Sequence, residues 1–403
     1  MPVPHASLGT ADVVVLGGGI IGTAIAERLS ALDLSVILVE AGPGIGAGSS
    51  GRCDGNVLLQ TKHDDLMISL TRQSVEGYRR WTQELDLDIR FEQTGSLLFF
   101  TDNREVEAAK DRAAHLRGLG LDAEFIDGDE LKRRESGLCG EFAGAIDCHD
   151  DAEVYPPSVV AGLAMAATRQ GCRIILNARA ERLIVDGTGR VTGVDTSAGM
   201  IAAPYVVNAL GAWSPHFRTG LDLPMPVVPR QGVLVVTQEC PELLRRNIRE
   251  SSYMSDRAIH AVDDNARVAF SAEPTYRGNI LIGSSRRFCG YDISVDFDIM
   301  VRIMERATMF LPALRNVQIL RTFAGLRPWT PDSLPLIGET EGAAGYILAT
   351  GHEGEGIGLA PITAEMVAAC ILNLATPPLT EQAMKLLSPD RFASHPPVAT
   401  PAV

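Results

Sequence analysis

The sequence predicts an α/β protein in which a second domain of mixed α and β structure is interleaved with the first. Near the N-terminus, a buried strand, a helix and another buried strand follow one another within residues 11–39, the pattern of a parallel β–α–β unit. Apolar strand-like segments then gather within residues 227–283, between regions where strands and helices alternate. With 403 residues, the chain is long enough for two domains.

The N-terminal unit is the most sharply patterned part of the chain. Residues 11–16 are apolar and β-branched and end at a glycine, as a buried parallel strand does. Residues 20–32 have helical spacing, and residues 34–39 form the second buried strand, which ends at Glu40. The following loop, residues 41–55, is rich in glycine and serine and too long for a simple connection, so we expect it to wrap a ligand.

The turn between the first strand and its helix carries a dinucleotide-binding pattern, because residues 17–22 read GGGIIG, a G-x-G-x-x-G motif. Gly17 permits the tight turn, Gly19 lets the backbone approach a pyrophosphate, and Gly22 lets the helix pack on the strand. The helix N-terminus offers N–H groups to phosphates. Glu40 stands where a carboxylate accepts ribose hydroxyls, which disfavours NADP but leaves FAD and NAD both open.

The remaining elements belong in turn to regions of alternating strands and helices and to a region rich in strands. Helices are predicted at residues 66–85, 105–119, 156–170, 299–310 and 357–374, and strands at 91–100, 172–176, 180–185, 191–195, 205–209, 227–237, 280–283 and 346–349. This order predicts a discontinuous nucleotide-binding domain, residues 1–85, 146–222 and 320–388, and a second domain with an antiparallel sheet, residues 86–145 and 223–319. The proline-containing tail, residues 389–403, is expected to be flexible.

Composition excludes several classes of function. The formal net charge of -14 argues against a nucleic-acid partner. The seven cysteines are scattered and form no C-x-x-C pair, so we expect no disulfide framework and no metal or iron–sulfur site in this chain. We see no export signal and no transmembrane segment, and expect a cytoplasmic protein, or one held at the inner membrane through partners.

Three further segments carry a family likeness. Residues 206–214 read VVNALGAWS, residues 324–332 read AGLRPWTPD, and residues 350–361 read TGHEGEGIGLAP. Each resembles a motif of the D-amino acid oxidase superfamily, and the three occur in the order found there. The resemblance implies a Rossmann-like FAD-binding domain, an antiparallel-sheet domain that binds the substrate, and non-covalent FAD, because no cysteine or histidine stands where sarcosine-oxidising relatives attach their flavin.

Two shorter segments point to one branch of the superfamily. Residues 229–237, PRQGVLVVT, and residues 281–288, LIGSSRRF, resemble the catalytic subunits of dye-linked proline, hydroxyproline and opine dehydrogenases. Glycine oxidase and sarcosine oxidase are close relatives. The likeness implies oxidation of the CH–NH bond of a secondary or cyclic amino acid to an imine, by hydride transfer to flavin N5. Electrons would then pass to a quinone or to a partner, such as a further flavin or iron–sulfur subunit.

Three alternatives remain open at this point. The chain could be an oxidase that reduces O₂ directly to hydrogen peroxide, a non-catalytic flavin subunit that relays electrons, or a nicotinamide-dependent dehydrogenase. Oxygen reactivity depends on a small charged pocket beside the flavin, which sequence does not reveal. A relay subunit would lack a clamp for the substrate.

The resemblance also assigns catalytic candidates. Arg327 matches the arginine that binds the substrate carboxylate in glycine oxidase, and a bidentate guanidinium suits that task. Its alternative role is an ion pair with Asp332. His352 is a candidate for orienting the substrate or tuning the flavin, or it is a structural hydrogen-bonding residue. Glu353 departs from the family pattern, and either receives the substrate amine or is a solvated carboxylate.

The pocket walls are assigned more broadly. Tyr253 and Tyr276 are candidate substrate contacts or core residues, Arg286 and Arg287 are candidates for steering an anionic substrate, and Cys53 is interpreted as a packing residue near the flavin. The predicted FAD contacts are Gly17, Gly19, Ile20, Ile21, Gly22, Glu40, Ser49, Ser50, Gly211, Gly325, Arg327, Gly351, His352, Gly354, Gly356 and Ile357.

Overall fold

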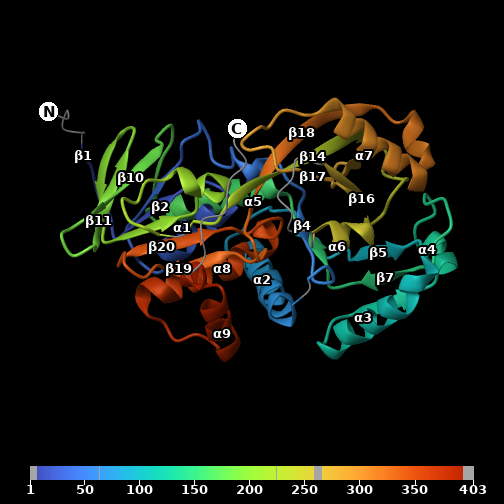
Figure 1. The fold of residues 1–403 in the computed structure, drawn as a ribbon, viewed down its shortest axis with the longest axis horizontal. Coiled ribbons are helices and arrows are strands. Elements are labelled where there is room, and N and C mark those ends of the chain that lie inside the picture. The colour runs from blue at the N-terminus through green and yellow to red at the C-terminus, as the bar shows by residue number, and fades with distance from the viewer. Residues whose placement is uncertain (1–6, 63, 224, 258–265, 394–403) are drawn as a thin grey trace.

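Two large sheets dominate the structure, a computed structural model that describes residues 7–62, 64–223, 225–257 and 266–393 (Figure 1). One sheet has six strands in the order β19-β20-β13-β2-β3-β9, and the other has eight in the order β18-β14-β17-β16-β15-β5-β7-β6. Within the described residues, no helix combines the length and apolar character needed to cross a bilayer.

The six-stranded sheet is the nucleotide-binding half predicted from the N-terminal pattern. All pairs are parallel except β19–β20, which is antiparallel. The four residues of β2 are fully buried, which explains its unbroken run of apolar residues. Its strands are β2 (Val13–Leu16), β3 (Val36–Val39), β9 (Arg173–Ile175), β13 (Tyr205–Asn208), β19 (Leu336–Glu339) and β20 (Tyr346–Thr350). The predicted α/β class with a Rossmann-like domain is confirmed.

Helices and a small sheet cover this half. Helix α1 (Ile20–Ser30) packs against α5 (Pro156–Arg169) and α8 (Gly356–Leu372). Apolar residues of β2 and β3 also pack on a four-stranded sheet, in the order β1-β12-β11-β10. Its strands are β1 (Ser7–Thr10), β10 (Ala180–Val185), β11 (Val191–Thr196) and β12 (Gly199–Ala202).

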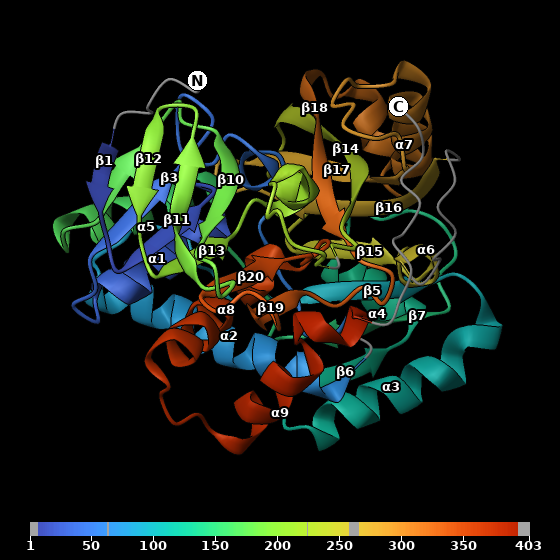
Figure 2. The ribbon, with the colours of Figure 1, turned by 60° about the vertical axis from the view of Figure 1, so that its left-hand side comes forward.

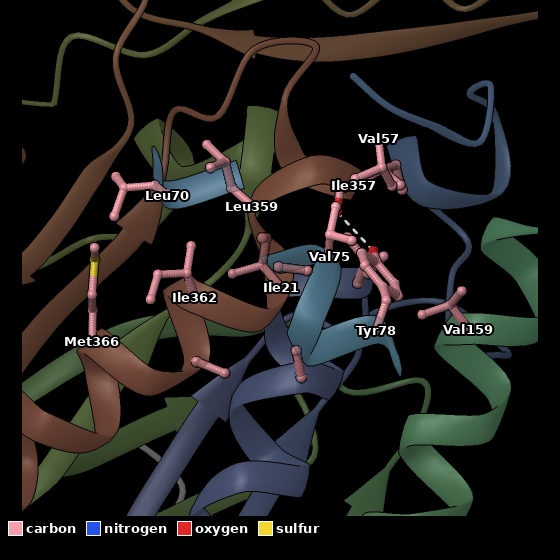
Figure 3. Close-up of a cluster of buried hydrophobic side chains, with 14 of the residues drawn as sticks. Ile21, Val57, Leu70, Val75, Tyr78, Val159, Ile357, Leu359, Ile362 and Met366 are labelled. Carbon is pink, nitrogen blue, oxygen red and sulfur yellow. Dashed lines mark hydrogen bonds between the residues drawn. The ribbon is translucent and has the colours of Figure 1, made fainter. Parts of the chain in front are cut away.

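Helix α2 (Asp65–Glu84) fixes the position of α8. The hydroxyl of Tyr78 donates a hydrogen bond of 2.7 Å to the carbonyl of Ile357, in the first turn of α8 (Figure 3). A Cβ placed on Gly77 would lie 2.4 Å from Cβ of Pro361, so the two helices are in close contact there. The start of α8 is therefore held by the core.

The eight-stranded sheet is antiparallel apart from the parallel pair β15–β5. Helix α7 (Phe297–Phe310) packs on one face of it (Figure 2). Its apolar residues share a core cluster with residues such as Val233 and Val235. Because alternate side chains of a strand point to opposite faces, Gly232 and Leu234 point the other way. The strands are β5 (Ser96–Phe100), β6 (Ala123–Ile126), β7 (Gly144–Cys148), β14 (Val228–Glu239), β15 (Asn247–Glu250), β16 (Arg267–Pro274), β17 (Asn279–Arg286) and β18 (Ile319–Trp329).

Some sequence predictions need correction. The expected boundaries at 145/146 and 319/320 cut through β7 and β18, which both pair within the eight-stranded sheet. The tail was expected to be flexible from residue 389, but Pro389–Phe392 forms a 3-10 helix and the Phe392 ring is buried. Residues 394–403 of that tail lie outside the described part of the chain.

Several short elements had no clear pattern in the sequence. They are a two-stranded sheet of β4 (Asn56–Val57) and β8 (Ala152–Glu153), and the helices α4 (Gly128–Arg134), α6 (Ser252–Arg257) and α9 (Pro378–Leu386). The predicted helix at residues 105–119 is α3 (Val106–Gly118).

Candidate active site

A cavity of about 490 Å³ lies where the two large sheets meet. Its wall combines the turn after β2, the loop before β4, the end of β13, strands β14 and β18, and the start of α8. Two predicted FAD contacts, Gly22 and Gly351, are not among the lining residues. The others all line it: Gly17, Gly19, Ile20, Ile21, Glu40, Ser49, Ser50, Gly211, Gly325, Arg327, His352, Gly354, Gly356 and Ile357.

The turn from β2 into α1 has no room for side chains. Gly17 has a φ of 103°, and a Cβ there would lie 2.5 Å from the carbonyl oxygen of Ala209. A Cβ on Gly22 would lie 1.9 Å from the carbonyl oxygen of Gly17, so this glycine serves the contact between helix and turn. The helix therefore begins directly at the cavity, where its first N–H groups favour a phosphate. This cradle fits the pyrophosphate of FAD.

Glu40 ties the glycine turn to the loop that follows β3. Its carboxylate accepts hydrogen bonds from the backbone N–H of Gly18, at 2.7 Å, and of Gly42, at 2.6 Å. The hydroxyl of Ser50 accepts from the N–H of Ile20 at 2.9 Å, and the hydroxyl of Ser49 donates to the carbonyl of Leu326. The loop thus connects both halves of the molecule, and the Glu40 oxygens keep further lone pairs for ribose hydroxyls.

The opposite end of the cavity is closed by the start of α8. Gly354 and Gly356 line it, and Glu355 occupies the N-cap position of the helix. The carboxylate of Glu355 forms an ion pair with the ammonium group of Lys62, and both side chains are buried. The positive end of the helix dipole faces the cavity, where it stabilises negative charge.

Arg327 lies flat against the neighbouring strand. A Cβ on Gly232 would lie 2.2 Å from its Nη1, so only glycine leaves room for the guanidinium. Nη1 donates a hydrogen bond of 3.1 Å to the carbonyl of Ser285. The alternative partner considered from the sequence, Asp332, is 2.7 Å from Arg391 instead. Arg327 is therefore fixed in the cavity wall.

Glu353 is not a solvated carboxylate. It has a φ of 48°, and its backbone N–H donates to the carbonyl of Pro328 at 2.9 Å. Its Oε1 lies 3.6 Å from Nη1 of Arg230 and 3.9 Å from Nε of Arg327, and the side chain is buried. Glu353 thus supplies a negative charge between two arginines at the edge of the cavity.

His352 is a buried, neutral residue. Its Nε2 is 3.1 Å from the hydroxyl of Thr363 in α8. Burial lowers the pKa of His352 to about 3, so the ring carries no charge near neutral pH. The hydrogen bond agrees with a structural role, while the place of His352 in the cavity wall keeps its role in orienting the substrate or tuning the flavin as a prediction.

The other residues predicted to line the substrate pocket lie in different places. Tyr253 lines the cavity, and the guanidinium carbon of Arg286 lies 4.2 Å from the centre of its ring. Tyr276 lies elsewhere, in a second pocket, with its ring centre 5.3 Å from that of Tyr155. Arg287 is engaged by Asp296 at 3.0 Å, as a structural residue would be. Burial raises the pKa of the Cys53 thiol, which makes it a poor nucleophile and agrees with a packing role.

Two arginines near the cavity were not singled out from the sequence. Arg230 in β14 and Arg249 in β15 are 2% and 3% exposed, although arginine is rarely buried without a function or a partner. Burial, opposed by the nearby charge of Glu353, lowers the pKa of Arg230 to about 10. The available signal was a single cation inside an apolar strand, as in the segment VVPRQGVLVV at residues 227–236.

Comparison with known proteins covers nearly the whole chain. The profile of the family described as FAD dependent oxidoreductase, DAO, matches residues 12–370. The hydrogen cyanide synthase subunit HcnC of Pseudomonas protegens is 28% identical, over 91% of this chain and 93% of HcnC. The glycine oxidase of Geobacillus kaustophilus is 27% identical, over 89% of this chain and 92% of the oxidase.

Solved structures share the same architecture. The L-proline dehydrogenase from P. horikoshii superposes with a TM-score of 0.84 and 27% identity, over 97% of this chain and 99% of that protein. The crystal structure of the Geobacillus kaustophilus glycine oxidase superposes with a TM-score of 0.82 and 26% identity, over 91% and 96% of the two chains.

Proposed function

Because the chain belongs to the DAO family of FAD-dependent oxidoreductases, we propose that it oxidises the CH–NH bond of a secondary or cyclic amino acid to an imine. Membership confirms the superfamily resemblance, the FAD cofactor and the class of amino acid oxidoreductase. The finer proposal is that electrons then pass to a partner subunit or a quinone. It draws support from the likeness to a protein named as a proline dehydrogenase and to one named as a synthase subunit.

The observation that carries the proposal is the position of Arg327. Its guanidinium is held flat by Gly232 and by the carbonyl of Ser285, and it faces the same cavity as the glycines at the start of α8. A planar guanidinium binds a carboxylate through two parallel hydrogen bonds and so fixes the plane of an amino acid. Such positioning is worth about 7 kcal/mol or more of a reaction barrier.

The side chains around Arg327 supply the rest of the chemistry. FAD, when bound in this cavity, supplies the acceptor for the hydride that leaves the substrate carbon. Arg327 binds the substrate carboxylate, and Glu353 places a negative charge next to that clamp, where it attracts the substrate amine. The N-terminus of α8 stabilises negative charge that develops during reduction. His352 is neutral and bonded to Thr363, so it holds the turn.

The test is flavin bleaching without oxygen. The purified protein is mixed anaerobically with proline, hydroxyproline, sarcosine, glycine and N-(carboxyalkyl) amino acids, and absorbance of the oxidised flavin is followed. We expect at least one secondary amino acid to bleach the flavin within seconds and to reduce an added dye. If no amino acid or amine bleaches it, the chain is a non-catalytic relay subunit and the proposal is wrong. Release of the intact flavin on denaturation would establish that FAD is held non-covalently.

A direct oxidase is the second candidate, since one of the relatives named above is a glycine oxidase, which resembles this chain both in sequence and in structure. The two candidates differ in the acceptor. In air-saturated buffer, peroxide released at the rate of substrate oxidation would support the oxidase. Slow peroxide release with fast dye reduction would support the dehydrogenase.

A further inference from the structure

Four arginines of the eight-stranded sheet lie at the substrate end of the cavity: one lines it and is partly buried, and the other three are buried nearby. Arg327 and Arg230 are cross-strand partners in β18 and β14. Arg249 follows Ile248, whose side chain packs in the core beneath α7, so Arg249 points to the cavity side. Arg286, at the end of β17, is 3% exposed. Such a concentration of cations inside a protein calls for negative partners.

Negative partners for two of these arginines have been described above. Arg230 and Arg327 share the carboxylate of Glu353 at 3.6 and 3.9 Å, and Arg327 is the proposed clamp for the substrate carboxylate. One carboxylate from the protein and one from the substrate therefore balance this pair.

The other two arginines flank Tyr253. The guanidinium carbons of Arg286 and Arg249 lie 4.2 and 5.1 Å from the centre of its ring. Among residues 7–62, 64–223, 225–257 and 266–393, Nε of Arg286 and both Nε and Nη1 of Arg249 have no hydrogen-bond partner. The nearest carboxylate to Arg249 is that of Asp54, at 3.9 Å, and no ion pair of Arg286 is found in the same part of the chain.

The pKa of Tyr253 reflects the positive charge of these two arginines. Burial opposes ionisation of its hydroxyl, but the charges of Arg286 and Arg249 outweigh burial and lower the pKa of Tyr253. The other acid near Arg249, Glu273, does not offset this field, because burial and neighbouring carboxylates raise its pKa well above the usual range. The wall around Tyr253 thus carries an excess of positive charge and faces the cavity through the tyrosine ring.

We propose that the substrate carries a second carboxylate, which binds at Tyr253 between Arg249 and Arg286 while Arg327 holds the first. The substrate class is then an amino acid with an additional acidic group, in its side chain or on the substituent of its nitrogen. This inference rests on the proposed amino acid oxidation and narrows it. A monocarboxylate such as proline or glycine would leave Arg286 without an anion and Arg249 with only the distant carboxylate of Asp54, which costs affinity.

Ligand binding tests the proposal without turnover. Succinate and butyrate have four carbons each and differ in one carboxylate, as do glutarate and valerate. Their dissociation constants are measured on the FAD-loaded protein from the flavin difference spectrum and by calorimetry. We expect each dicarboxylate to bind about tenfold to a hundredfold more tightly than its partner. Equal binding within each pair would overturn the proposal.

Matched variants test whether Arg286 and Arg249 bind the second carboxylate. Arg286→Met and Arg249→Met keep an unbranched apolar stem and remove the charge, and we expect each to abolish the preference for dicarboxylates with little change in monocarboxylate binding. Arg302→Met is the control, because Arg302 lies on the outer helix α7 and bonds the carbonyl of Ala266. Equal loss of both ligand classes in the first two variants would indicate a merely structural role and contradict the proposal.

Turnover separates this inference from the proposed function. Anaerobic bleaching is compared for sarcosine and iminodiacetate, and for norvaline and glutamate. Faster bleaching by the dicarboxylate of a pair supports both proposals. Bleaching only by monocarboxylates would leave the amino acid oxidation standing and reject the second carboxylate. No bleaching by these four or by the panel used for the proposed function, together with tight succinate binding, would reject the oxidation and leave the anion site standing.

Discussion

The two ends of the cavity are suited to negative charge by different means. At the glycine turn after β2, recognition rests on backbone N–H groups and on the start of α1, and the carboxylate of Glu40 is bonded to the backbone of Gly18 and Gly42. At the eight-stranded sheet, it rests on guanidinium groups such as the partly buried Arg327 and the buried Arg286. The first end is specified by close backbone approach, and the second by charges that strands far apart in sequence bring together.

The largest effect is expected from a substitution in the glycine turn after β2. Gly22→Ala introduces a Cβ 1.9 Å from the carbonyl oxygen of Gly17, so the helix must move away from the turn. We expect loss of bound FAD, measured as the ratio of flavin to protein absorbance after purification. Gly44→Ala is the matched control, because a Cβ there meets nothing within 4 Å. Normal flavin content in Gly22→Ala would show that the turn does not need this glycine.

The second largest effect is expected at the end of the cavity formed by the eight-stranded sheet and its arginines. Glu353→Gln removes the negative charge that lies 3.6 Å from Arg230 and 3.9 Å from Arg327. Leaving these cations without it should lower the free energy of unfolding by about 3 kcal/mol, measured by urea denaturation of the FAD-loaded protein. The control is Glu341→Gln at the exposed surface, which should change little. Equal stability of the two variants would mean that Glu353 does not balance the arginines.

A smaller effect is expected from the titration of His352, which lines the cavity next to Glu353. The folded-state pKa of His352 is lowered to about 3, below that of an unfolded histidine, about 6.5. The unfolded chain therefore binds the extra proton, so stability present above about pH 6.5 is lost as pH falls toward 3. His352→Gln should flatten this acid-side slope by up to about 1.4 kcal/mol per pH unit. Unfolding free energies at pH 7, 6 and 5 test it, and an unchanged slope would contradict a buried neutral histidine.

The smallest expected effect lies outside both ends. Tyr276 is 41% exposed and lines the second pocket, with Arg90 4.9 Å from its ring. Tyr276→Ala should leave flavin content unchanged and change the rate of flavin bleaching by less than about twofold. A loss comparable to that of a residue in the cavity would show that the second pocket takes part in the reaction.

The difference between the two ends also explains which features could be predicted from sequence. The glycine turn, Glu40 and the strands around them lie within residues 11–40, where local periodicity and spacing determine the structure. Arg327 was found because its motif resembles one from a known superfamily. Arg249 could not be assigned, since its neighbours Asp54 and Tyr253 come from another loop and another helix.

Two further errors have the same origin. The sequence predicts that the chain re-enters the nucleotide-binding domain at residue 320. In the structure, residues 319–329 form strand β18, which pairs with β14 in the eight-stranded sheet. Phe392 was assigned to a flexible tail, but it is buried beside strands of the six-stranded sheet that no local pattern connects to it. Long-range pairing and burial decide both features, and a single sequence does not display them.

We propose that Arg327 holds the carboxylate of an amino acid in the cavity that fits FAD. The most direct measurement is the rate of anaerobic flavin bleaching in rapid mixing, for the natural chain and for Arg327→Ala loaded with equal FAD. For Arg327→Ala we expect a loss on the order of a hundredfold to a thousandfold in the second-order rate constant, with unchanged thermal stability. Bleaching at the same rate in both proteins would contradict it.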